Sequence, residues 1–170
     1  VASGTGMFSG AGVINFLEVS AQLGILAVAA ALLMIGGEFD LSTGVAVTFS
    51  SLAASMLAYN LHLNVWLGAF LALILALAVG FFNGFLVMKT RIPSFLITLS
   101  TFLMLTGINL AVTKLVTGQV ATPSISDMQG FDSAHKVFAS SFTLFGVSVR
   151  MTVVWWILFT LVATWVLMRT

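Results

Sequence analysis

Apolar residues fill long stretches of the chain, and polar residues gather in short clusters between them. Residues 19–37 carry no charged side chain, a length of about 20 residues that suits one crossing of a bilayer. Residues 41–88 also lack Asp, Glu, Lys and Arg, and this run is too long for a single helix at about 1.5 Å per residue across a core of about 30 Å. The pattern therefore predicts two helices there, separated at residues 59–64.

Three further segments complete the predicted architecture. Residues 92–113 form another apolar run, and residues 151–168 form a short final one. Between them, residues 114–150 are more polar and predict a loop outside the membrane that contains a short helix or a hairpin. We expect an all-α, polytopic membrane helix bundle with about five transmembrane helices and a break at residues 36–44.

The composition agrees with membrane insertion. Hydrophobic residues make up 60% of the chain and charged residues only 6%, with a mean hydropathy of +1.17, which leaves too little polar surface for a soluble core of this size. The net charge of +1 argues against a nucleic-acid partner. There is no cysteine, and the two histidines lie in separate loops without ligand spacing, so we expect no metal and no cofactor.

The break at residues 36–44 combines two glycines with two acids. An ionised carboxylate at bilayer depth costs about 2.5 to 3.5 kcal/mol on insertion scales, so Glu38 and Asp40 should face a bundle interior or a wet cavity. Gly36 and Gly37 weaken the helix, and the freed backbone groups must be satisfied by protein or by a water-filled path. We therefore predict that this segment borders a path through the bundle.

A second interpretation of Asp40 is structural. It precedes Leu41, Ser42 and Thr43, so its carboxylate is placed to accept a hydrogen bond from the backbone N–H two or three residues further on. The two interpretations are compatible, because a capped helix directs its positive N-terminus into whatever cavity the break lines. Glu18 is expected to be a solvated carboxylate at the outer edge of the first span.

Other polar side chains form lines along predicted helix faces. Ser94, Thr98 and Thr101 share one face, and a similar line follows the break, made of Gly44, Thr48, Ser51 and Ser55. These hydroxyls either bond to carbonyls of their own helix or share a polar cleft. Asn83 either bonds to a neighbouring helix or lines the path. The candidate residues of the substrate path are Glu38, Asp40, Ser42, Asn83, Thr98 and Thr101.

Small residues recur at every fourth position of the helix predicted over residues 65–88. Such a stripe lets two helix backbones approach closely. Ala76, Gly80 and Gly84 are therefore predicted to serve helix packing.

Four segments resemble motifs of the permease subunits of bacterial ABC importers for ribose, xylose and related sugars. Residues 37–44 resemble the motif G-[GE]-I-D-L-S-V-G, and residues 80–87 are similar to G-x-x-N-G-x-L-V. Residues 92–99 are similar to I-P-x-F-I-x-T-L, and residues 167–170 to the L-x-R-T that opens the cytoplasmic coupling loop of that family. The four occur in the order and at the spacing of the family.

The resemblance implies one transmembrane permease domain over residues 1–170, the N-terminal half of a longer permease, with residues 114–150 as an extracytoplasmic loop. It implies a multi-pass protein of the bacterial plasma (inner) membrane that translocates a monosaccharide delivered by an extracytoplasmic sugar-binding protein. The implied partners are cytoplasmic ATP-binding subunits and a second permease subunit, identical or different. The sequence contains no G-x-x-x-x-G-K-[ST] motif, so we expect no enzyme here and ATP hydrolysis on a separate subunit.

Two alternatives remain open at this point. One is a permease of the same family for nucleosides or branched-chain amino acids. The other is a channel or a secondary transporter in which Glu38 or Asp40 binds a proton or sodium ion.

Overall fold

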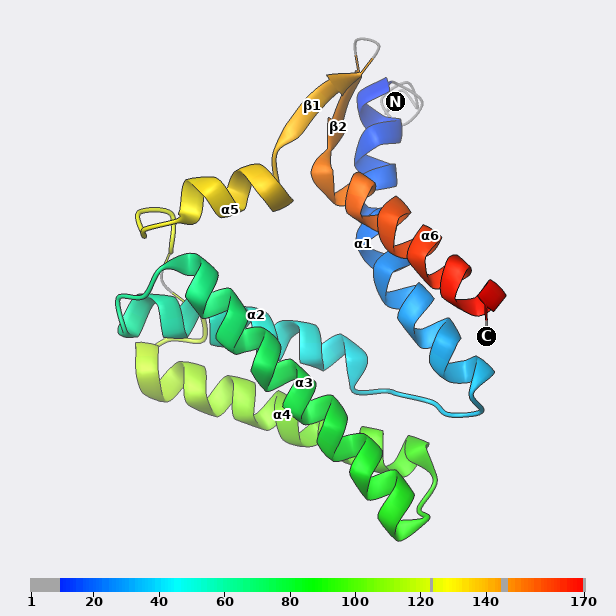
Figure 1. Ribbon diagram of the computed structural model, residues 1–170. Helices are drawn as coiled ribbons and strands as arrows, with labels where there is room; N and C mark the ends of the chain where they lie inside the picture. The colour runs from blue at the N-terminus through cyan, green and yellow to red at the C-terminus, as the bar shows by residue number, and fades with distance from the viewer. Residues whose placement is uncertain (1–9, 123, 145–146, 170) are drawn as a thin grey trace, which may run out of the picture. The chain divides into compact units, whose positions relative to one another are not determined.

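The computed structural model describes residues 10–122, 124–144 and 147–169. In chain order the elements are α1 (Gly10–Ile35), α2 (Thr43–Asn60), α3 (Val65–Thr90), α4 (Ser94–Thr117), α5 (Phe131–Phe138), β1 (Ser141–Leu144), β2 (Val147–Arg150) and α6 (Met151–Arg169) (Figure 1). They form two compact units. One comprises the chain up to residue 32 and from residue 135 onward, and the other comprises residues 33–134.

Within the described residues, four helices are long and apolar enough to cross a membrane: α1 from Gly12 onward, α3, α4 and α6. This confirms the predicted all-α, polytopic membrane architecture. The remaining predicted span corresponds to α2, which has 18 residues and is absent from these four. Several serines and threonines lower its hydropathy, so four of the about five predicted spans meet these two criteria among the described residues.

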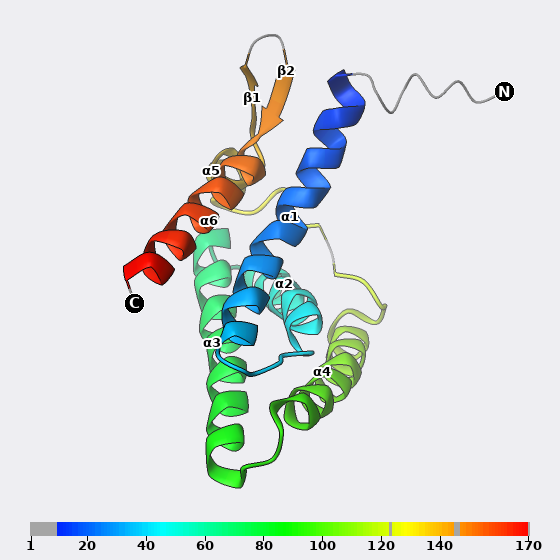
Figure 2. The ribbon, with the colours of Figure 1, turned by 90° about the vertical axis from the view of Figure 1, so that its right-hand side faces the viewer.

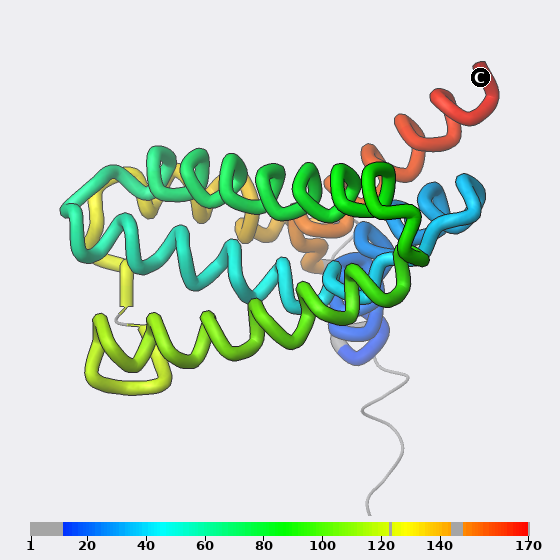
Figure 3. The backbone as a smooth tube through the Cα atoms, turned by 90° about the horizontal axis from the view of Figure 1, so that it is seen from below, coloured from blue at the N-terminus to red at the C-terminus, as the bar shows by residue number. Residues whose placement is uncertain are grey.

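In the unit of residues 33–134, α2 packs against both α3 and α4, and α3 packs against α4. Figure 3 shows these three helices side by side. α2 and α3 approach each other closely at Gly68, where an added Cβ would lie 2.9 Å from the backbone oxygen of Ala54. Ala58 and Ala72 are buried beside it. Small side chains therefore allow α2 and α3 to pack closely.

The other unit contains most of α1, the hairpin and α6. Ser141 of β1 pairs with Arg150 of β2 in an antiparallel register, and β2 leads directly into α6 (Figure 2). The segment predicted to be an extramembranous loop thus holds both a short helix, α5, and a hairpin. Gly24 of α1 faces α6, and a Cβ there would overlap the indole ring of Trp156.

The expectation that Glu18 is solvated is wrong. Only 8% of Glu18 is exposed, and its Oε1 lies 2.6 Å from Nη1 of Arg150. Because α1 begins at Gly10, Glu18 lies inside the helix and not at its outer edge. A carboxylate can be buried at such a position when it is paired with a cation.

Candidate functional site

The predicted break is present, and a glycine ends the first helix there. α1 stops at Ile35, and Gly37 adopts a left-handed conformation with φ of +82°. The Gly37 N–H donates to the Met34 carbonyl at 3.0 Å, and the Glu38 N–H donates to the Leu33 carbonyl at 3.2 Å. This pair of bonds is a common helix C-cap that favours glycine at the left-handed position. The chain then runs without helical structure until α2 begins at Thr43.

Hydroxyl groups of α4 hold the backbone of the break. The Phe39 N–H donates to Oγ of Ser94 at 3.0 Å, and the Leu41 N–H donates to Oγ1 of Thr98 at 3.2 Å. Thr98 is 3% exposed. Backbone groups freed by a break at membrane depth must find partners within the protein or in water. The polar face predicted on α4 supplies two of these partners.

The Asp40 carboxylate accepts from the backbone N–H two residues further on, but it forms a turn before α2 and does not cap the helix, because the N-cap residue is Ser42. Its Oδ1 accepts from the Ser42 N–H at 2.7 Å and from the Ser42 hydroxyl at 2.6 Å. The acceptor is therefore two residues before the donor, as the sequence suggested, and it stabilises the turn that opens α2.

Three more side chains extend from Asp40 into the bundle. Nδ2 of Asn83 donates to Oγ of Ser42 at 3.1 Å, and Oγ1 of Thr101 donates to Oδ1 of Asn83 at 2.6 Å. Ser42, Asn83 and Thr101 are all buried. Every donor points toward the carboxylate, so the hydrogen bonds reinforce one another. We call Asp40, Ser42, Asn83 and Thr101 the Asp40 network.

A cavity of about 250 Å³ lies beside this network, and we call it the Asp40 cavity. Its polar wall contains Glu38, Asp40, Asn83, Ser94 and Thr98. Its remaining wall is apolar or glycine: Leu33, Phe39, Gly80, Gly84, Val87 and Met88. Glu38 is exposed, and within the described chain no hydrogen bond reaches its carboxylate or Oδ2 of Asp40. The cavity therefore offers carboxylate oxygens to a solute.

The residues predicted for the path divide into two groups. Glu38, Asp40, Asn83 and Thr98 line the cavity, whereas Ser42 and Thr101 are buried in the network behind it. Contact with cargo stays a prediction for all six.

The three small residues predicted to serve helix packing lie along α3. Gly80 and Gly84 line the cavity, and a Cβ on either would meet nothing within 4 Å in the described chain. Ala76 is half-buried. Their role in helix packing also stays a prediction.

A model of the protein family described as the permease component of branched-chain amino acid transport systems matches residues 12–170. The chain belongs to this permease family. It is also 31% identical over 100 residues to the inner membrane ABC transporter permease protein YjfF of Escherichia coli (strain K12). That match covers 59% of this chain and 30% of the relative, so the chain spans only part of the relative's length. The comparison with solved structures found no match to this chain.

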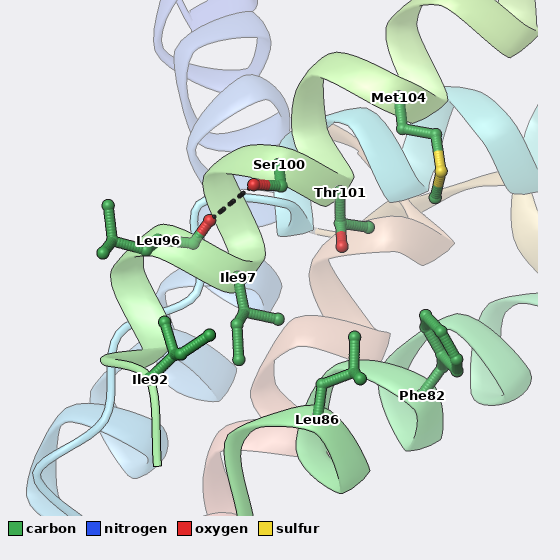
Figure 4. Close-up of a pocket in the computed structure, with 8 residues that line it drawn as sticks. All are labelled: Phe82, Leu86, Ile92, Leu96, Ile97, Ser100, Thr101 and Met104. Atoms are coloured by element: carbon green, nitrogen blue, oxygen red, sulfur yellow. Dashed lines mark hydrogen bonds between the residues drawn. The ribbon is translucent and has the colours of Figure 1, made fainter. Parts of the chain in front are cut away.

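Another hollow of this permease chain lies between α3 and α4 and is mostly apolar. It measures about 450 Å³ and is lined by Phe82, Leu86, Ile92, Leu96, Ile97, Ser100, Thr101 and Met104 (Figure 4). Both of its hydroxyls have partners, because Ser100 donates to the Leu96 carbonyl at 2.8 Å and Thr101 donates to Asn83. We call it the apolar groove, and its surface suits hydrocarbon better than a hydroxylated solute.

Sequence reasoning missed Asn109 on α4. This amide is partly exposed and lines a further groove, between α2 and α4, together with Thr48. The signal that would have found it is an isolated amide well inside an apolar span, because such a group is costly in lipid.

Proposed function

We propose that this chain forms part of the transmembrane permease subunit of an ATP-binding-cassette importer in the bacterial plasma membrane. In this proposal the importer translocates a monosaccharide delivered by an extracytoplasmic binding protein. Family membership and the likeness to an inner membrane ABC permease support the class of transporter. The observation that carries the mechanism is the Asp40 cavity, where a broken helix presents acidic oxygens to a hollow between helices.

The cavity has the chemistry of a weak site for hydroxyl groups. Sugar hydroxyls can donate to Oδ2 of Asp40 and to the carboxylate of Glu38, while the carbon skeleton lies against Val87 and Met88. Binding should be weak, because a permease that holds its cargo tightly cannot release it. Alternating access would open this wall to one side of the membrane and then to the other.

The charge of the cavity favours sugars over amino acids. An amino acid brings an ammonium group and a carboxylate, and the two acids of the cavity would suit only the ammonium group. The residues that line the cavity include no Lys, Arg or His that could pair with the carboxylate. A sugar is uncharged and leaves no group without a partner.

The proposed assembly combines this permease with three partners. Cytoplasmic ATP-binding subunits supply ATP hydrolysis, because the sequence lacks the phosphate-binding motif of such proteins. A second permease subunit, identical or different, completes the pathway. Residues 114–150 lie on the outer side in this arrangement, where α5 and the hairpin can contact the sugar-binding protein.

Uptake into proteoliposomes tests the proposal. The complete transporter, with its ATP-binding and solute-binding proteins, is reconstituted and offered labelled ribose, xylose, galactose and leucine. We expect uptake of at least one sugar, and only when ATP is present on the side of the membrane that the ATP-binding subunits face. Uptake driven by a proton or sodium gradient without ATP would instead support a secondary transporter, and ATP-dependent uptake of leucine alone would support an amino-acid permease.

A further inference from the structure

A separate groove lies on the α2 and α4 side of the bundle, and we call it the Asn109 groove. It has a volume of about 430 Å³. Its walls are Gly44, Val45, Thr48 and Leu52 from α2, Phe102, Thr106, Asn109, Leu110 and Thr113 from α4, and Val120 beyond α4. The Asp40 cavity and this groove share none of these residues, so they are distinct hollows.

Two polar side chains in the groove have no partner among the described residues. Asn109 is partly exposed and lies more than two turns from either end of α4, and no hydrogen bond joins its amide to another described group. The exposed hydroxyl of Thr48 on α2 has no side-chain bond there either. By contrast, Thr106 donates to the Phe102 carbonyl at 2.7 Å. The groove therefore presents an unused amide from one wall and an unused hydroxyl from the other.

These groups need a polar occupant. An amide well inside a spanning helix is costly when it faces hydrocarbon, so such residues face a bundle interior or a watery cavity. An amide both donates and accepts, which is also what a sugar hydroxyl does. Phe102, Leu52 and Leu110 add apolar surface for the carbon face of a small ring. No charged residue lines the groove, so it suits an uncharged solute.

The groove begins at the break that forms the Asp40 cavity. Gly44, the last residue of the predicted break, lines the groove, while Glu38 and Asp40 of the same segment line the cavity. A Cβ on Gly44 would meet nothing within 4 Å among the described residues, so there is open space at this end. Ser42, which donates to Asp40 and accepts from Asn83, lies between these two stretches in the sequence.

We propose that the Asn109 groove is a second subsite for a hydroxyl-bearing, uncharged solute on the transport path, with Asn109 and Thr48 as its polar contacts. The inference rests on the proposed function for the identity of the solute. The transport path then contains an acidic site at Asp40 and a neutral site on α2 and α4. A sugar would move between the carboxylates of the first site and the amide and hydroxyl of the second.

Cysteine accessibility tests this subsite. The sequence contains no cysteine, so Asn109→Cys, Thr48→Cys and the control Ile108→Cys each introduce a single thiol. Ile108 is also exposed, neighbours Asn109 on α4, and is not among the residues that line the Asn109 groove. The complete transporter in proteoliposomes is treated with a charged methanethiosulfonate, which reacts with the thiolate that forms in water.

We expect the thiols at positions 109 and 48 to react and the thiol at position 108 to stay unmodified. A sugar that the transporter takes up, at about four times its dissociation constant for the groove, should slow both reactions about fivefold. A sugar that it does not take up should leave both rates unchanged. If Asn109→Cys fails to assemble, Thr48→Cys carries the same test from the opposite wall.

Two results would overturn the inference. Absence of reaction at both positions would mean that lipid or another helix fills the groove. Reaction at a rate that no transported sugar alters would mean a hydrated groove without a solute subsite. Neither result bears on the proposed function, which is tested by ATP-dependent uptake. Conversely, uptake without ATP would reject the proposed function, while protection of the two thiols by sugar would still support the subsite in the groove.

Discussion

Two acidic residues, Glu18 and Asp40, lie in or beside apolar helices but are stabilised in different ways. Glu18 is buried in α1 and forms an ion pair with Arg150, whose side chain is 52% exposed. Asp40 has no cationic partner among the described residues and instead accepts two hydrogen bonds from Ser42, which Asn83 and Thr101 support. The Glu18 carboxylate is stabilised by the positive charge of Arg150, whereas the Asp40 carboxylate is stabilised by neutral N–H and O–H donors.

The difference separates a structural acid from an acid available to a solute. The ion pair links α1 to the end of β2, just before α6, and its two residues line neither the Asp40 cavity nor the Asn109 groove. Asp40 has no cationic partner among the described residues and lines a cavity, and its Oδ2 accepts no hydrogen bond from them. A carboxylate held by neutral donors can bind and release an uncharged cargo without breaking a strong ion pair first. We therefore expect changes at Asp40 to affect transport and changes at Glu18 to affect folding.

The largest expected effect is at Asp40. Asp40→Ala removes the carboxylate and with it both hydrogen bonds from Ser42, and it should abolish uptake by the reconstituted transporter. Asp40→Asn keeps an oxygen that accepts from Ser42, so the protein should fold normally while uptake falls about tenfold or more, because bonds to a charged acceptor are stronger. Near-normal uptake by Asp40→Ala at normal expression would exclude a transport role for this residue.

A smaller effect is expected at Asn83, which connects Ser42 to Thr101. Asn83→Leu removes both hydrogen bonds and leaves the buried Thr101 hydroxyl without its acceptor, at a cost of about 2 kcal/mol in unfolding free energy. Unfolding of the purified permease in mixed micelles measures this loss. Phe81→Leu, at an exposed position of the same helix, is the control and should change little. Equal stability of the two variants would show that the network is unimportant for folding.

The smallest expected effect, a loss of unfolding free energy, is at the ion pair of Glu18 and Arg150. Glu18→Ala should lower the unfolding free energy by about 1 to 2 kcal/mol, less than for a fully buried pair because Arg150 is half-exposed. Arg150→Ala and the double variant complete a cycle whose coupling energy isolates the pair. Uptake per folded molecule should not change. A large fall in uptake by the Glu18 variant would remove the distinction drawn between the two acids.

Some features of the site could be predicted because they depend on local sequence. Gly37 and Asp40 specify where α1 ends and how α2 begins, since both use bonds between residues at most five apart. The role of Ser94 and Thr98 as partners of the break could not be predicted, because it joins residues 55 to 57 positions apart. Sequence periodicity placed these hydroxyls on one face of α4 but did not identify what that face contacts.

The sequence by itself determined that the chain is a helical membrane protein with an acidic break, because apolar run length and the free energy of burying charge are properties of the residues alone. Only the tertiary structure decided that Glu18 is paired, that Ser42 and Thr101 support Asp40 from behind, and that Asn109 lines a groove of its own. Each of these depends on which helix faces lie against one another. In an apolar chain many faces are similarly hydrophobic, so a few long-range hydrogen bonds distinguish one packing from another.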